Sequence, residues 1–297
     1  MLINEFEEHI SYTFESDDCI YMLGMKLIKR LEINDCIPVI KVLYNNVPKL
    51  LGGIDGLKKL SVVINEISNI DLNRALKKIA ESLNIINESD FIKMTSVDIN
   101  FNRLFFDMKN KCIKYVILPI NVECDFHDGV GWSWQFRNTL LVLLSRILVN
   151  MPKKYNEAYS IISNMENDDK TIVSYVLNYD LDNIILNEKN ENKTSKAYRL
   201  ILKHSGKAGD ILFVINKEKY IIGKSAKTAD GVIEGYDSIS RRHCRICQND
   251  NLFTVEDLES TNGTILNGYR LNSYEKYYIN NGDKLVLADL EFDVIVE

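Results

Sequence analysis

Residues 257–268 read Asp-Leu-Glu-Ser-Thr-Asn-Gly-Thr-Ile-Leu-Asn-Gly. This stretch contains two Asn-Gly pairs, Asn262-Gly263 and Asn267-Gly268, and Asn-Gly between short apolar segments is a strong signal of a tight hairpin turn. A hydroxyl group and an amide, those of Thr261 and Asn262, stand at the first of these turns. The stretch therefore predicts short antiparallel strands joined by turns that carry polar side chains.

Strand-length apolar segments lie on both sides of this stretch, separated by Gly and Asn breaks. They cover residues 200–204, 210–215, 219–222, 245–247, 253–257, 284–288 and 291–296. Many short strands with Asn-Gly turns are typical of a β-sandwich. We therefore expect residues 197–297 to form an all-β sandwich domain.

Three further motifs accompany the turn stretch in a fixed order. They are Ile-Gly-Lys-Ser at 222–225, Ser-Arg-Arg-His at 240–243 and Asn-Gly-Asp-Lys-Leu at 281–285. A phosphate group carries a charge of about −1.5 to −2 and three acceptor oxygens. The cations of Lys224 and Arg241 and the hydroxyl of Ser240 can satisfy such oxygens. Sandwich loops present these groups on a rigid scaffold.

The ordered set of four motifs resembles the forkhead-associated (FHA) domain. The resemblance implies that Ser240 and Arg241 contact phosphate, and that Thr261 and Asn262 contact the phosphothreonine and the peptide main chain. It implies that His243 braces the binding loops. It also implies structural turn roles for Gly223, Asn267 and Gly268, and phosphothreonine as the ligand. Lys224 departs from the arginine usual in the family, which keeps the charge but loses the planar fork.

Three other motifs resemble sites of different chemistry. Gly223-Lys224-Ser225 resembles the end of a nucleotide-binding P-loop, but that motif needs a glycine where Glu218 stands. Cys244 and Cys247 resemble half of a zinc site, but no second pair of ligands lies nearby in the sequence. The third is the stretch 123–129, where Asp125, His127 and Asp128 could hold a cation, although a polar loop is the favoured interpretation. We expect no metal and no cofactor.

The chain before the sandwich predicts an α+β domain over residues 1–186, followed by a polar linker at 187–196. We expect strands at 19–29, 39–44, 103–106 and 113–118 and helices at 57–67, 72–86, 136–148, 155–165 and 171–177. Asp71 is the expected N-cap of the second helix. Trp132 and Trp134, just before the third, are expected to anchor it in the core.

The order of elements, with Ile-Asp-Gly-Leu at 54–57, Leu-Phe-Phe-Asp at 104–107 and Tyr-Val-Ile-Leu-Pro at 115–119, resembles bacterial pseudokinase-like domains fused to FHA modules. Kinase chemistry needs a glycine-rich loop and an His-Arg-Asp catalytic motif, and the sequence contains neither. We therefore expect no catalytic residues here. This domain is expected to be an interaction platform for a second protein.

The composition narrows the choice of partners and location. The formal net charge of −6 argues against nucleic acid as a partner. The acidic start predicts no secretory leader, and the longest apolar run, at 139–149, falls short of the roughly 20 residues that cross a bilayer. Six scattered cysteines suit reduced thiols. We therefore expect a cytoplasmic protein with no membrane insertion, and the abundance of Asn, Ile and Lys suggests a bacterial source.

Taken together, these features predict a non-catalytic adaptor that binds phosphothreonine-containing proteins, in bacterial signalling or in secretion-apparatus regulation. Two alternatives remain open. One is a divergent kinase-like or metal-dependent enzyme that the FHA domain targets. The other is a scaffold that binds its partner independently of phosphorylation.

Overall fold

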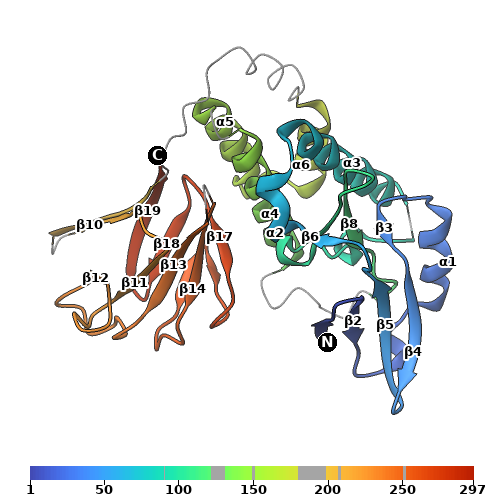
Figure 1. Ribbon diagram of the computed structural model, residues 1–297, viewed down its shortest axis with the longest axis horizontal. Helices are drawn as coiled ribbons and strands as arrows, with labels where there is room; N and C mark the ends of the chain where they lie inside the picture. Colours follow the sequence, from blue (N-terminus) through green and yellow to red (C-terminus); the bar gives the residue numbers. More distant parts are fainter. Residues whose placement is uncertain (90, 122–130, 149–150, 180–198, 207–208, 250–251) are drawn as a thin grey trace. The chain divides into compact units, whose positions relative to one another are not determined.

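The computed structural model describes residues 1–297 except 90, 122–130, 149–150, 180–198, 207–208 and 250–251 (Figure 1). Leaving those positions aside, the chain forms two compact units. The N-terminal unit comprises Met1–Leu143 and Ile161–Glu191, and the C-terminal unit comprises Leu144–Ser160 and Asn192–Glu297. The predicted linker at 187–196 lies outside the described residues.

The N-terminal unit contains two small sheets. The first is antiparallel, in the order β1-β2-β5-β4. Its strands are β1 (Leu2–Glu5), β2 (His9–Thr13), β4 (Val39–Tyr44) and β5 (Val47–Gly53). The second has the order β3-β8-β7-β6, with β3 and β8 parallel. Its strands are β3 (Cys36–Ile37), β6 (Lys58–Lys59), β7 (Phe105–Asp107) and β8 (Cys112–Val116).

Helices follow and interrupt these strands. The α-helices are α1 (Met22–Arg30), α2 (Leu60–Val63), α3 (Asn69–Asn87), α4 (Trp132–Ile147), α5 (Pro152–Ile162) and α6 (Asp169–Asn178). Short 3-10 turns are η1 (Asp17–Cys19), η2 (Ile64–Glu66), η3 (Met94–Ser96) and η4 (Phe101–Arg103). Among the described residues, no helix combines the length and the apolar character that a bilayer crossing requires.

Several details of the expected secondary structure are wrong. The helix expected at 57–67 is replaced by the strand β6, the short helix α2 and the 3-10 turn η2. The segment 19–29 was expected to be a strand, but its greater part forms α1. Its apolar residues lack strict alternation, and Met, Leu and Lys favour helix. The N-cap of α3 is Ser68 rather than Asp71, because the Ser68 hydroxyl accepts from the backbone N–H of Asp71 at 3.1 Å.

The core of the N-terminal unit confirms the role expected of the two tryptophans. Trp132 and Trp134 are 4% and 6% exposed, and they lie in the first turn of α4 rather than before it. The indole N–H of Trp132 donates to the carbonyl of Val97 at 2.8 Å. Helices and strands therefore occur together as expected, while the likeness to a pseudokinase stays a prediction.

The C-terminal unit is built around a β-sandwich, as the sequence predicts (Figure 1). One sheet has the order β10-β9-β19-β18-β15-β16 and the other β12-β11-β13-β14-β17. The strands are β9 (Leu200–Gly206), β10 (Gly209–Ile215), β11 (Lys219–Gly223), β12 (Gly231–Val232), β13 (Cys244–Asn249), β14 (Leu252–Asp257), β15 (Thr264–Leu266), β16 (Tyr269–Arg270), β17 (Tyr277–Ile279), β18 (Lys284–Leu287) and β19 (Leu290–Val296).

Residues 144–160, which the sequence analysis assigned to the N-terminal domain, group with the sandwich. Polar contacts connect this segment with the sandwich. The hydroxyl of Tyr159 donates to the buried carboxylate of Asp283 at 3.2 Å, and the amide of Asn281 donates to Asn156 at 3.0 Å.

The register of the five-stranded sheet gathers three connections at one end. Cys244 at the start of β13 pairs with Ile222 near the end of β11, and with Asp257 at the end of β14. The chain therefore leaves β11, enters β13 and leaves β14 at the same edge of the sandwich. The connections 224–230, 233–243 and 258–263 meet there.

Candidate functional site

The first two connections at this end run side by side. The backbone N–H of Lys224 donates to the carbonyl of Ser240 at 3.0 Å, and that of Ser225 donates to the carbonyl of Arg241 at 3.3 Å. Gly223 makes this approach possible, because a Cβ there would overlap the carbonyl oxygen of Arg241 and lie 2.9 Å from that of Ser240. The residues with the predicted phosphate-binding groups therefore lie on adjacent backbone segments.

The third connection is held in shape by the carboxylate of Asp257, which is 2% exposed. It accepts from the N–H and the hydroxyl of Ser260 at 3.0 and 2.6 Å, from the hydroxyl of Thr264 at 2.7 Å and from that of Ser273 at 3.0 Å. Burial acts to raise the pKa of Asp257, but these hydrogen bonds outweigh it and bring the pKa below its ordinary value. The loop 257–264 is thus fixed by one buried anion.

Further hydrogen bonds tie this loop to the segment around Ser240. The N–H of Thr261 donates to the hydroxyl oxygen of Ser240 at 3.0 Å, and the amide of Asn262 donates to the carbonyl of Ser238 at 2.8 Å. Behind the loop, the guanidinium of Arg270 donates to the carbonyl of Asn262 at 2.9 Å. Thr261 and Asn262 remain exposed. The two loops therefore form one connected surface.

His243 joins the same two loops from inside. Its ring is fully buried, Nδ1 accepts from the N–H of Ser240 at 3.2 Å, and Nε2 faces the carbonyl of Gly263 at 3.1 Å, so Nε2 carries the proton. Burial lowers the pKa of His243, because the charged ring would lose its water. A neutral His243 thus braces both loops.

This arrangement makes the stability of the C-terminal unit depend on pH. Because the pKa of His243 is lower in the folded state, the unfolded chain binds the proton more readily, and the stability that His243 contributes above pH 6.5 is lost as the pH falls. We expect denaturant unfolding of the full chain to show a larger loss of stability between pH 7.5 and 5.5 for wild type than for His243→Leu. The control is His204→Leu, in the same sandwich. Equal losses of stability over this pH range in wild type, His243→Leu and His204→Leu would contradict the prediction.

The structure brings together most of the site residues predicted from the sequence. Lys224, Ser240, Arg241, Thr261 and Asn262 lie on the three connections at one end of the sandwich. Lys224 is exposed, and its ammonium donates to the carbonyl of Asp237 at 3.2 Å. Gly223 and His243 lie directly behind these residues, although Gly223 serves the close approach of two backbone segments rather than a turn.

Asn267 and Gly268 lie elsewhere. They form the turn between β15 and β16, with φ of 50° and 83°, at the end of β15 away from Gly263. The Asn267 side chain donates to Asp283 at 2.8 Å and accepts from the N–H of Lys284 at 2.9 Å. This pair therefore orders the turn beside β18. Among the described hydrogen bonds, neither residue contacts the loops that carry Ser240 and Asn262.

Three residues that shape the site, Asp257, Ser238 and Arg270, were not predicted as site residues from the sequence. For Asp257 a signal existed, since an Asp followed three residues later by Ser commonly closes a local turn through its side chain. Ser238 and Arg270 lie 24 and 8 residues from Asn262 in the sequence, so no local pattern predicts their contacts with it.

Of the two motifs that resemble metal sites, only the cysteine pair lies within the described residues. Cys244 is fully buried in β13, and burial raises the pKa of its thiol. Within the described residues no group of three or more His, Cys, Asp or Glu is placed to hold a metal ion. The possible cation ligands Asp125, His127 and Asp128 lie outside those residues.

The fold and the loops define a class: a β-sandwich that presents hydroxyl, amide and cationic groups from three adjacent loops. The family model of the FHA domain matches residues 220–288. The chain therefore contains an FHA domain, as its sequence motifs predict.

Solved structures include similar domains. The FHA domain of the CT664 protein from Chlamydia trachomatis is 30% identical, over 33% of this chain and 96% of its own, with a TM-score of 0.30. The FhaA FHA domain, solved in complex with the intracellular domain of Rv3910, is 25% identical over 34% and 99% of the two chains, with a TM-score of 0.28. No curated protein matches this sequence.

Proposed function

We propose that this protein is a cytosolic, non-catalytic adaptor that binds phosphothreonine-containing protein segments through its FHA domain. The supporting observation is the hydrogen-bonded pairing of 224–225 with 240–241, which sets the backbone segments of Lys224, Ser240 and Arg241 side by side. The N-terminal unit docks a second protein in this proposal. Bacterial signalling or secretion-apparatus regulation is the setting that the motifs favour.

The chemistry of the three side chains suits a phosphate dianion. Among the described residues, the exposed guanidinium of Arg241 makes no ion pair, so it is available to an incoming anion. The Lys224 ammonium donates one N–H to the backbone carbonyl of Asp237, and its two other N–H donors remain for a ligand. The hydroxyl of Ser240 adds a short-range contact. Charge-assisted bonds of this kind are roughly twice as strong as neutral ones.

The deciding experiment compares three forms of the same peptide. Peptides recovered from a phosphothreonine library with the full chain would be resynthesised with phosphothreonine, phosphoserine or threonine at the central position. We expect the phosphothreonine form to bind at least ten-fold more tightly than the threonine form in isothermal titration calorimetry. Equal affinities for the phosphorylated and unphosphorylated forms would favour a phosphorylation-independent scaffold instead.

Substitutions at two site residues should have graded effects on this affinity. Ser240→Ala removes one hydroxyl and is expected to weaken binding by about 1 kcal/mol, roughly five-fold, because a single hydrogen bond contributes about that much. Lys224→Arg is expected to leave the affinity unchanged or to tighten it, since a guanidinium can grip two phosphate oxygens. Calorimetry with the phosphothreonine peptide measures both changes, and a clear loss of affinity in Lys224→Arg would place the phosphate away from residue 224.

A further inference from the structure

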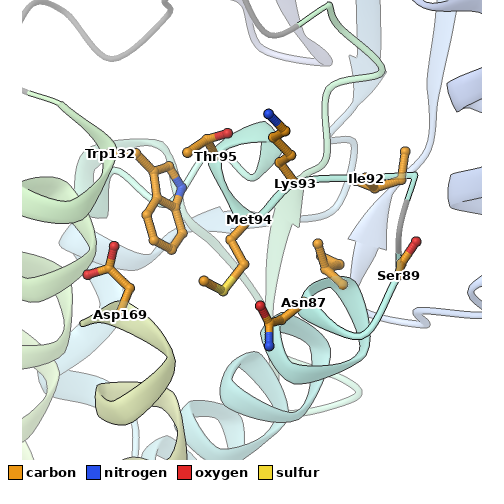
Figure 2. Close-up of a pocket in the computed structure, with 9 residues that line it drawn as sticks. Asn87, Ser89, Ile92, Lys93, Met94, Thr95, Trp132 and Asp169 are labelled. Carbon is orange, nitrogen blue, oxygen red and sulfur yellow. The ribbon is translucent and has the colours of Figure 1, made fainter. Parts of the chain in front are cut away.

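The N-terminal unit contains an open pocket of about 260 Å³, formed by the end of α3 with Ser89, by the segment 92–95 and by the starts of α4 and α6 (Figure 2). Its wall is mainly apolar, with Ile86, Ile92, Met94 and Trp132, and its mouth carries Lys93 and Asp169. The polar residues Asn87, Ser89 and Thr95 complete the lining. Figure 2 shows the Trp132 indole, the Met94 side chain and the Asp169 carboxylate around the same space. The pocket thus combines an apolar interior with a charged mouth.

The apolar wall is rigid. The indole of Trp132 is fixed by its hydrogen bond to Val97 and by stacking on Phe136, with ring centroids 5.0 Å apart and 19° between the planes. Ile86 is fully buried and Ile92 is 5% exposed, so both are held by the surrounding core. An apolar group that enters the pocket therefore meets a surface that is already ordered, which lowers the cost of binding.

The two charged residues at the mouth differ in whether their charge is paired within the unit. The Asp169 carboxylate accepts from the hydroxyl of Ser133 at 2.7 Å and pairs with the guanidinium of Arg137 at 3.4 Å, so its charge is compensated within the unit. Lys93 is exposed, and in the part of the chain that the structure describes it forms no ion pair. The mouth therefore offers an uncompensated cation, which an acidic group would complement.

The open form of the pocket favours one of two kinds of occupant, a small molecule or a protein side chain. Sites for small molecules have volumes of about 300–1,000 Å³ and enclose most of the ligand. This pocket is near the lower end of that range and is open rather than enclosing, which favours a single side chain inserted from a protein surface, the way in which interface anchors bind.

We propose that this pocket anchors one apolar side chain of a partner protein, aromatic or Leu/Met, with an Asp or Glu beside it in the partner's sequence to pair with Lys93. The inference rests on the proposed adaptor role and specifies the chemistry of the second partner. The anchor fills the space between Trp132 and Met94, and the acidic neighbour lies at the mouth.

The test uses a phage-displayed library of unphosphorylated random 12-residue peptides, panned against the full chain. We expect the selected peptides to share an apolar residue next to Asp or Glu. Their affinity should fall about ten-fold in Lys93→Glu, because attraction is replaced by repulsion, and should fall in Met94→Ala through lost contact. Exchanging the acidic residue of the peptide for Lys should restore its affinity for Lys93→Glu.

Two controls make the outcomes distinguishable. Lys26→Glu reverses an exposed lysine on α1, away from the pocket lining, and should bind the selected peptides like wild type. Phosphothreonine-peptide binding by each variant reports separately on the FHA site. Peptides that bind Lys93→Glu and Met94→Ala as well as wild type, or a library that yields no shared motif, would overturn the proposal. So would tight binding of 3-phenylpropionate with no selected peptide, which would identify a small-molecule pocket.

Discussion

Arg241→Ala is expected to remove most phosphopeptide binding while the fold stays intact. Arg241 is exposed on the connection 233–243, and among the described residues its guanidinium supports no other part of the structure. Its backbone carbonyl, which accepts from Ser225, is retained in the variant. The loss therefore falls on the contact with phosphate. Removing one partner of a desolvated charge pair costs about 2–5 kcal/mol, or roughly 30-fold to several thousand-fold in affinity.

Arg242→Ala is the matched control for this variant. Arg242 is the next residue in the chain, has the same charge and is also exposed. Its charge acts on the nearby Tyr274, so its removal should change the affinity by no more than a few-fold. Calorimetry with the phosphothreonine peptide measures both variants. Equal losses would mean that the phosphate senses only the net charge of the loop and makes no direct contact with Arg241.

Gly223→Ala should damage both the stability of the C-terminal unit and its binding of phosphopeptide. The added Cβ would overlap the carbonyl oxygen of Arg241 and lie 2.8 Å from its carbonyl carbon. Both atoms are backbone, and the hydrogen bond from Ser225 holds that carbonyl in place. Overpacking of this kind costs roughly 1–3 kcal/mol. The chain can relieve it only by moving 240–241 away from Lys224, which would disperse the site.

Gly235→Ala separates this clash from a general cost of replacing glycine. Gly235 lies on the connection 233–243, with a φ of +81° and open space around its Cβ position. An alanine there is strained only by its left-handed backbone conformation, at a cost of roughly 1–2 kcal/mol. We expect denaturant unfolding to show comparable losses for the two variants, whereas calorimetry shows a large loss of affinity for Gly223→Ala alone. Full phosphopeptide affinity in Gly223→Ala would contradict the importance of the close approach.

The sandwich could be predicted because its signals are local. The Asn-Gly pairs and the apolar segments of 200–296 each mark a turn or a strand within a few residues. Strands of two or three residues, such as β12 and β16, were missed because so short a segment shows no alternation. In the N-terminal unit, α3 was predicted from its helical periodicity. The helix α1 was missed because its mostly apolar segment was interpreted as a buried strand, although its apolar residues do not alternate and Met, Leu and Lys favour a helix.

The site could be predicted only in part, for a different reason. Ser240, Arg241 and Thr261 belong to recognisable motifs, so their types and positions are visible in the sequence. The Asp257 carboxylate accepts hydrogen bonds from Ser260, Thr264 and Ser273, and this set depends on the tertiary folding of residues up to 16 positions apart. The pocket beside Trp132 draws its lining from four separate segments. Contacts of this kind follow from the packing of distant elements and leave no pattern in any one stretch.

The buried carboxylate of Asp257 has a consequence for the time course of recognition. Because it and His243 hold the loops in shape before any ligand arrives, no slow rearrangement has to precede capture. Encounter should then proceed at the usual rate for preformed surfaces, about 10⁵–10⁷ M⁻¹s⁻¹. Differences in affinity among phosphopeptides would then appear chiefly as differences in residence time.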